Sequence, residues 1–444
     1  MESDRKLEFK IVIEYFAIAA IAIEAVFAAF WLFKNLGVIQ SDFVAHTYIL
    51  AAESLKVDDS MGILYALLVR VFGHGVILQL LQIVAVTASI FCFSLGVFEK
   101  RTGLTIALLT AFNPLMLQAE TAISPNALVL ACVLTVIVSL AGKSVGKGRI
   151  VAAFVATLAA GFLNPDYAYL FLTTEVIYIV IRLITRKKFE ILLLAVCIIA
   201  FAAPVVTNNI IRDDYAYRRV HRTVSFLGLQ RLAWPRMHDY LDSVKFIANY
   251  NLQEDTGEYT DYFGFLKEAD KVPENMAMHF AYDFEYMIGA EAARRGYEEM
   301  VGITFSKGPG YWAPALVRDE ILYLFSPISS AAVLIRHTPD TSVFSGLKLL
   351  FNGSPSAFKV YYIFSSVAAF LLTLMYIAKF IGERVFGKKA LGSSMAVWLF
   401  GIIVLLSLYA TLVCVREYDY RNVLFMIVGW PAAAMALTER RVDR

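Results

Sequence analysis

Charged residues are scarce in this chain of 444 residues: they make up 18% of it, whereas hydrophobic residues make up 59%. Soluble proteins contain about 25% charged and about 45–50% apolar residues. The mean hydropathy of +0.63 points in the same direction. This composition argues against a water-soluble globular enzyme and predicts a protein with several membrane-spanning segments.

The chain also has almost no net charge and few cysteines. The 40 basic and 38 acidic side chains leave a net charge of +2, whereas a nucleic-acid-binding protein needs an excess of Lys and Arg to neutralise phosphates. The four cysteines all lie in apolar runs, and no two form a CxxC pair. We therefore expect no nucleic-acid partner, no disulfide and no thiolate metal site.

Long apolar runs, in contrast, are abundant. A bilayer core about 30 Å thick requires about 20 apolar residues per helix. Several runs are shorter than this. The two shortest are Leu104–Leu117 and Val151–Leu163, so one helical pair is expected to be tilted, extended by its polar flanks or partly re-entrant. The ten predicted spans are Ile11–Phe33, Val76–Phe98, Leu104–Leu117, Ala127–Ala141, Val151–Leu163, Tyr167–Ile184, Ile191–Ile211, Val360–Ile381, Met395–Val415 and Val423–Leu437.

Lys and Arg cluster before the first of these runs and after every second one, which is typical of cytoplasmic loops. We therefore expect both termini in the cytoplasm. The first run has no cleavage site after it and is expected to remain as an anchor. The five loops expected outside the cytoplasm are 35–60, 118–125, 164–166, 212–359 and 416–421.

These features predict an all-α polytopic membrane protein in three parts. Residues 1–211 form an N-terminal transmembrane module, residues 212–359 an extracytoplasmic or interfacial domain of mainly helical character, and residues 360–444 a C-terminal transmembrane module. The active face is expected to be extracytoplasmic, because acidic residues occur in all five outer loops.

One surface helix is predicted in the first outer loop and a second directly after it. Apolar residues recur at helical spacing from Val44 to Leu55, and a second helix is expected at Met61–Phe72. Asp42 precedes the first helix, one turn before His46, and has two interpretations. It is either an N-cap that accepts backbone hydrogen bonds, or a base whose pKa is raised from about 4 by partial desolvation.

The order of the motifs resembles the GT-C superfamily of glycosyltransferases that use polyprenyl-phosphate sugars. The nearest patterns are those of protein mannosyltransferases and aminoarabinose transferases. The resemblance covers most of the membrane part but not residues 224–302. It rests on Asp-x-x-x-His-x-Tyr-x-x-Ala-Ala-x-x-Leu from Asp42, Ala-Phe-Asn-Pro-Leu followed by Glu120 and Ser-Pro-Asn-Ala, Gly-Phe-Leu-Asn-Pro-Asp at Gly161–Asp166, and Arg-Glu-Tyr-Asp-Tyr-Arg-Asn at Arg416–Asn422.

The resemblance implies an enzyme that transfers a hexose or pentose from a polyprenyl phosphate to a glycan, lipid or protein acceptor, with inversion. Asp42 would be the general base, although many relatives carry Asp-Glu where this chain has Asp42 and Phe43. The leaving phosphate requires cations, for which arginine is suited. The residues expected to bind substrate are His46, Glu120, Asp166, Arg218, Arg219, Arg222, Arg416 and Arg421.

Other interpretations of these residues stay open. The arginines near residue 220 are equally consistent with a belt at lipid head groups, and those of the last outer loop with a surface ion-pair network. No cofactor is expected, but Asp42, Glu120 and Asp166 together would offer a divalent cation hard oxygen ligands.

Two other functions also remain: a transporter or flippase of lipid-linked sugars or polysaccharide, and a non-catalytic cell-envelope assembly subunit. Transport predicts ionisable residues inside the spans. Glu24 and Glu175 are nearly the only ones there, whereas acids concentrate in the outer loops. This distribution favours chemistry at the outer surface.

Overall fold

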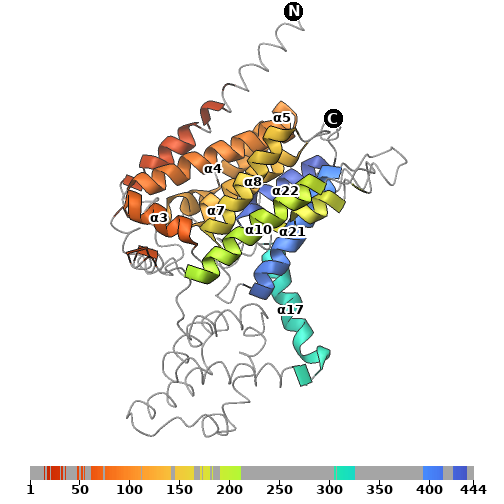
Figure 1. Ribbon diagram of the computed structural model, residues 1–444. Coiled ribbons are helices and arrows are strands. Elements are labelled where there is room, and N and C mark those ends of the chain that lie inside the picture. The colour runs from red at the N-terminus through yellow and green to blue at the C-terminus, as the bar shows by residue number, and fades with distance from the viewer. Residues whose placement is uncertain are drawn as a thin grey trace, which may run out of the picture. The chain divides into compact units, whose positions relative to one another are not determined.

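The computed structural model describes eight continuous stretches and several shorter ones. The continuous stretches are residues 62–73, 76–111, 113–141, 146–164, 191–211, 308–325, 394–413 and 424–437. Shorter pieces lie within residues 15–55 and 171–183 and at 305–306. All regular secondary structure in these described residues is helical (Figure 1). The predicted all-α class is confirmed for this part of the chain.

The helices coincide closely with the predicted apolar runs that they cover. Of the two shortest runs, one begins earlier than expected, at Lys147, and the other is divided in two. The helices are α3 Ile63–Phe72, α4 Val76–Val97, α5 Lys100–Ala111, α6 Pro114–Thr121, α7 Asn126–Leu140, α8 Lys147–Leu163, α10 Ile191–Ile211, α17 Pro309–Leu324, α21 Ser394–Val413 and α22 Phe425–Ala436.

By length and composition, one helix among the described residues is long and apolar enough to cross a membrane, namely α4. The number rises to two if the bent pair α5 and α6 counts as one span. Shorter apolar helices include α3, α7 and α22. The expectation of ten spans and of a particular orientation therefore stays a prediction.

The chain divides into two compact units. The first contains residues Met1–Arg212, Phe325–Leu405 and Val423–Arg444, and the second contains Asp213–Leu324 and Leu406–Asn422. The expected boundaries after residues 211 and 359 stay predictions.

Helix α4 is central to the first unit. It packs against α5, α6 and α7, while α8 packs against α7, α10 and α3 (Figure 1). In addition, α22 contacts α5. These contacts bring the first turn of α4 and the segment after α6 to one place, where the candidate site lies.

The chain bends by 67° between α5 and α6. Pro114 is the first residue of α6, a position where its missing N–H costs nothing. The side-chain oxygen of Asn113 accepts a hydrogen bond from the Leu115 N–H at 3.0 Å and so satisfies one of the free donors at the start of α6. The predicted span Leu104–Leu117 is therefore a broken helix, in which α6 runs in a new direction.

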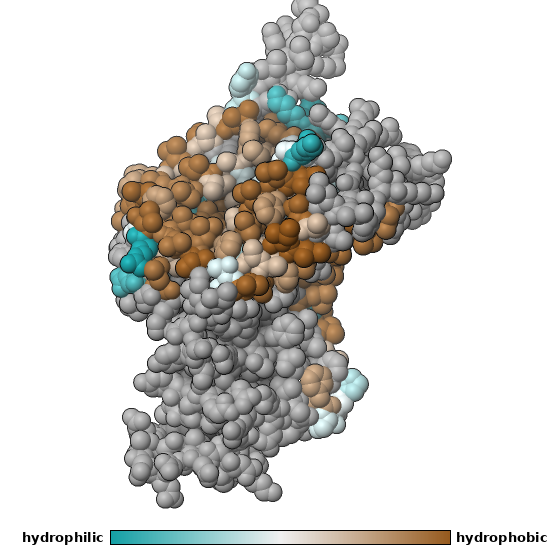
Figure 2. All heavy atoms as spheres, in the orientation of Figure 1, coloured by the Kyte–Doolittle hydropathy of each residue, from teal (hydrophilic) through white to brown (hydrophobic). Residues whose placement is uncertain are grey.

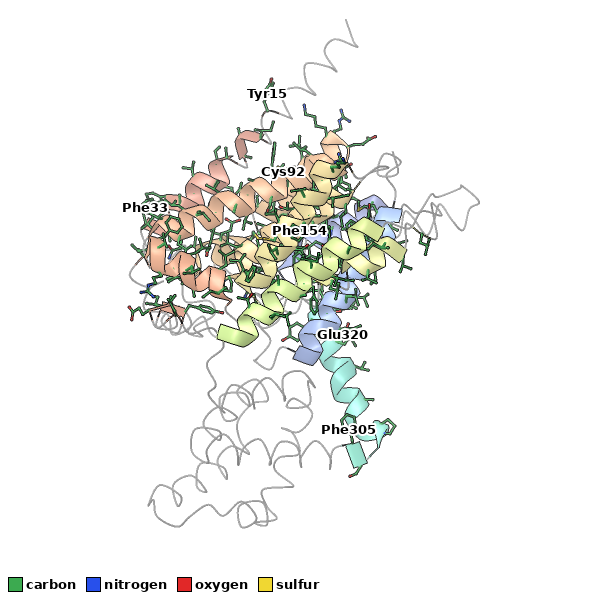
Figure 3. All side chains as sticks on the ribbon, viewed as in Figure 1. Tyr15, Phe33, Cys92, Phe154, Phe305 and Glu320 are labelled. Carbon is green, nitrogen blue, oxygen red and sulfur yellow. The ribbon has the colours of Figure 1, made fainter. Side chains whose placement is uncertain are left out.

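Helix α4 has the opposite polarity to a surface helix of a soluble protein. Its exposed face carries Ile77, Leu81 and Val84, and its buried face includes Gln79 and Gln82. Apolar side chains cover much of the first unit's visible surface (Figure 2). Phe33 and Cys92 are among the exposed residues (Figure 3). The described surface of this unit is therefore suited to an apolar environment.

The described part of the second unit consists of α17 and the last turns of α21. Ser407 of α21 is fully buried and donates a hydrogen bond to the carboxylate of Glu320 on α17 (Figure 3). This polar contact joins two helices that are more than 80 residues apart in the sequence.

Helix α3 begins in direct contact with the end of α8. The N–H of Gly62 donates a hydrogen bond to the Leu163 carbonyl at 2.9 Å. A Cβ atom on Gly62 would lie 2.1 Å from the Phe162 carbonyl oxygen, so only glycine permits this approach. The contact joins the first predicted outer loop to the residues just before the third.

We predict that Gly62→Ala lowers the free energy of unfolding by about 1–3 kcal/mol, the usual cost of overpacking, because two backbone segments must separate. Thermal unfolding of the detergent-purified protein measures this. Gly148→Ala is the matched control: a Cβ there meets nothing within 4 Å, and Ala favours a helix by about 1 kcal/mol over Gly. Equal unfolding temperatures for the two variants would contradict the close contact at Gly62.

Candidate functional site

The buried side-chain amide of Gln82 connects three segments of the first unit. Its Nε2 atom donates hydrogen bonds to the carbonyl of Glu120 at 3.0 Å and to that of Ala122 at 2.8 Å. Its Oε1 atom accepts a hydrogen bond from the Tyr65 hydroxyl at 3.2 Å. Gln82 therefore holds the segment after α6 against α4 and, through Tyr65, against α3.

Tyr65 is fully buried and serves as the donor in this network. Burial raises the pKa of its hydroxyl well above 10.0, and the neighbouring Tyr48 raises it further, while a hydrogen bond with the Ser124 backbone acts in the opposite direction. The hydroxyl therefore keeps its proton at neutral pH and can donate it to Gln82.

Tyr48 connects the first predicted outer loop to the network. The rings of Tyr48 and Tyr65 meet edge to face, with their centroids 5.9 Å apart. Tyr48 and Ala52, one helical turn apart, are both buried, as the expected amphipathic helix requires. In the sequence, Asp42 and His46 precede Tyr48 by six and two residues.

The turn between α6 and α7 is stabilised by its own side chains. The Thr121 hydroxyl donates to the Leu117 carbonyl at 2.9 Å, and the Ser124 hydroxyl oxygen accepts from the Asn126 N–H at 3.3 Å. Serine in this position satisfies a free donor at the start of α7. The turn therefore holds a fixed shape beside Gln82.

Glu120 lies in the last turn of α6, and its side chain is fully buried. Among the described residues, neither of its carboxylate oxygens has a hydrogen-bond partner. Burial raises the pKa of this carboxyl well above its ordinary value of 4.5, and the nearby Glu24 carboxylate raises it further. Without a cationic partner, Glu120 is therefore a neutral acid at pH values where an exposed glutamate is ionised.

Glu24 reaches this region from the N-terminal helical segment. Glu24, Ala28 and Leu32 are spaced by four residues and are buried, whereas Ile23 and Phe27 are exposed. The carboxylate therefore lies on the packed face of its segment. Neither of its oxygens has a hydrogen-bond partner in the described part of the chain.

Gln79 is a third polar side chain buried in this region. It lies one turn before Gln82 on α4, so the two amides project from the same helix face. Gln79 is fully buried, and within the described residues its amide oxygen and nitrogen have no hydrogen-bond partner. Native proteins rarely leave buried polar atoms unsatisfied, and those that remain often mark a ligand or water site.

A third buried carboxylate, that of Glu175, lies in a different environment. It accepts a hydrogen bond from the Thr157 hydroxyl at 2.5 Å and another from the Cys197 thiol. Nearby, Tyr178 packs against Trp398, with the ring centroids 4.8 Å apart. These contacts join residues 171–183 to α8, α10 and α21, which is a structural role.

The substrate-binding role of Glu120 stays a prediction, to which the structure adds that its carboxyl is buried. The other expected site residues, which are Asp42, His46, Asp166, Arg218, Arg219, Arg222, Arg416 and Arg421, lie outside the described residues.

Sequence reasoning missed Tyr65, Gln79 and Gln82. Two glutamines three residues apart in an otherwise apolar run were a detectable signal, because a buried amide requires partners. The pairing of Gln82 with residues 38 and 40 positions away was not detectable without the fold. Within the described residues, no three side chains of His, Cys, Asp and Glu come together as metal ligands.

No protein-family model, curated protein or solved structure matches this chain. The resemblance to glycosyltransferases therefore rests on the sequence motifs alone.

We predict that Gln82→Leu lowers the free energy of unfolding by about 3 kcal/mol or more, because it leaves one buried hydroxyl and two buried carbonyls without their shared partner. Thermal unfolding measures the loss. Ser94→Ala, also on α4, is the control. The Ser94 hydroxyl is buried and has no partner among the described residues, so its removal is expected to be neutral or stabilising. An equally small effect of both substitutions would show that the Gln82 hydrogen bonds contribute little.

We also predict that Glu120→Gln flattens the dependence of stability on pH. A carboxyl with a raised pKa in the folded state stabilises most below its unfolded pKa, and this contribution is lost as pH rises through the folded pKa. In a chelating buffer, the wild-type unfolding temperature should fall as pH rises above about 4.5, more steeply than that of the variant. Parallel curves would contradict a raised pKa at Glu120.

Proposed function

We propose that the chain is an integral membrane glycosyltransferase that moves a sugar from a polyprenyl phosphate to an extracytoplasmic acceptor. The observation that carries this proposal is that segments next to three predicted outer loops come together. Tyr65 on α3, which follows the first loop, is joined through Gln82 to Glu120 in the second, and Gly62 contacts Leu163, the residue before the third. Three of the four motifs that resemble glycosyltransferases thus come from separate segments that are connected through α3.

The polarity of α4 supports a location in the membrane. A helix with isoleucine, leucine and valine on its exposed face and glutamines on its buried face is stable where the surroundings are apolar. Exposed valines and isoleucines on α8 and α10 extend the same surface. The cell membrane, with multiple spans and both termini in the cytoplasm, remains the proposed location.

In the proposed reaction, Asp42 accepts the proton of an acceptor hydroxyl or amine as that group attacks the anomeric carbon. A new bond forms to this carbon, the bond to the phosphate oxygen breaks, and the lipid phosphate leaves from the opposite face. Attack from the opposite face inverts the configuration. The proposed arginines near residue 220 and in the 416–421 loop stabilise the charge on the departing phosphate.

Transport is the second candidate, and one observation favours it. Glu24, Glu120 and Glu175 are all buried among helices of the first unit. Ionisable residues inside membrane helices commonly mark a pathway for ions or substrates. Movement of lipid-linked sugar without transfer would agree with this candidate.

We predict that Asp42→Asn lowers the transfer rate by about 100-fold or more, because a general base contributes about 10²–10⁴ to the rate. The assay uses the purified full-length protein, radiolabelled polyprenyl-phosphate sugars and a cell-envelope acceptor extract. Glu53→Gln is the matched control, since Glu53 is an exposed acid in the same loop.

The possible outcomes separate three cases. Equal transfer by wild type and the Asp42 variant would reject Asp42 as the base but retain the enzyme. Exchange of lipid-linked sugar across vesicles, with no transfer by either protein, would replace the proposed enzyme with a transporter.

A further inference from the structure

Glu24 and Glu120 are both buried, and the Glu24 carboxylate is close enough to raise the pKa of Glu120. No basic residue in the described part of the chain is buried with them. Every described Lys and Arg of the first unit is exposed on its helix. These are Arg70, Lys100, Arg101, Lys147 and Arg149. Two ionised carboxylates cannot be buried close together unless something neutralises them. The pair therefore requires bound protons or a bound cation.

Gln79 is an independent sign that a ligand occupies this place. Its amide is fully buried and has no partner within the described residues. It projects from the face of α4 on which Gln82 contacts the Glu120 carbonyl. A protonated carboxyl could donate to this amide oxygen, but neither glutamate makes that bond in the structure, whereas a cation between the three side chains would be coordinated by all three oxygens at once.

The burial of these oxygens restricts the size of the ligand. The carboxylate oxygens of both glutamates and the amide oxygen of Gln79 are shielded from solvent. A sugar or a lipid head group would need an open cavity beside them. A single ion without its hydration shell would not.

Charge and ligand type then identify the class of ion. Two carboxylates balance one divalent cation, whereas a monovalent cation would leave a buried negative charge. Carboxylate and amide oxygens are hard ligands, which calcium, magnesium and manganese prefer. Zinc prefers nitrogen and sulfur, and the glutamates and Gln79 provide neither thiolate nor imidazole.

We propose that Glu24, Glu120 and Gln79 bind one divalent cation through their side-chain oxygens. The ion links the N-terminal helical segment to α4 and to the end of α6. It thereby fixes the relative positions of these helices below the predicted outer loops. This site differs from the combination of Asp42, Glu120 and Asp166 considered from the sequence. It does not depend on the proposed glycosyl transfer.

We predict that the full-length protein, purified in detergent and stripped with a chelator, binds one Mn²⁺ per chain at neutral pH. Loss of the free-Mn²⁺ signal in electron paramagnetic resonance measures binding without any sugar donor. Mn²⁺ or Ca²⁺ should also raise the unfolding temperature, because a ligand that binds only the folded state stabilises it. Glu24→Gln and Glu120→Gln should each weaken binding more than about tenfold.

Glu175→Gln is the matched control, because it removes a buried carboxylate whose oxygen is already hydrogen-bonded to Thr157. It should bind Mn²⁺ as wild type does. Glu24→Gln and Glu120→Gln remove charge repulsion and should fold, which gel filtration checks. Gln79→Leu keeps both carboxylates and should weaken binding less.

Three outcomes would overturn the site. They are no stoichiometric Mn²⁺ binding, equal binding by wild type and both glutamate variants, or stabilisation by acidic pH without any stabilisation by Mn²⁺ or Ca²⁺. The last would mean that the pair holds protons. The Mn²⁺-binding measurement uses no sugar donor. A negative binding result therefore leaves the transfer assay unaffected, and a negative transfer result leaves the binding measurement unaffected.

Discussion

The hydrogen bonds of Gln82 are the constraint on which the arrangement of the segments around the candidate site depends. A buried amide must find partners for both its donors and its acceptor, and in an apolar bundle few partners exist. Gln82 finds one carbonyl in the last turn of α6, another just after α6, and the hydroxyl of Tyr65. Any movement of α3 or of the turn before α7 breaks at least one of these bonds. The geometry of the site is thus set from within the helix bundle.

The helices were largely predictable from the sequence because their cause is local. An apolar run of the right length forms a helix wherever it lies, and the run Ile191–Ile211 has the bounds of α10. The bend after α5 was only partly predictable from the sequence. Asn113 and Pro114 marked an interruption, but its direction depends on packing against α4 and α7. The number of spans rests on composition alone.

The candidate site was less predictable because its contacts join distant segments. Glu120 was identified from its motif, but neither its burial nor its proximity to Glu24 follows from a pattern of neighbouring residues. Tyr65 and Gln82 belong to no motif that carries chemistry, and their roles follow from hydrogen bonds between separate helices. Asp42 and the arginines lie outside the described residues, so they remain sequence-based proposals.

The burial of Glu120 supports a role different from that of Asp42, the proposed base. A general base must reach the acceptor hydroxyl within hydrogen-bonding distance. The Glu120 carboxyl is shielded from solvent, and its raised pKa keeps it protonated in the absence of a cation. It is therefore suited to holding the structure beneath the outer loops. A base that meets an acceptor must be accessible to it, which argues against Glu120 as the base of the proposed chemistry.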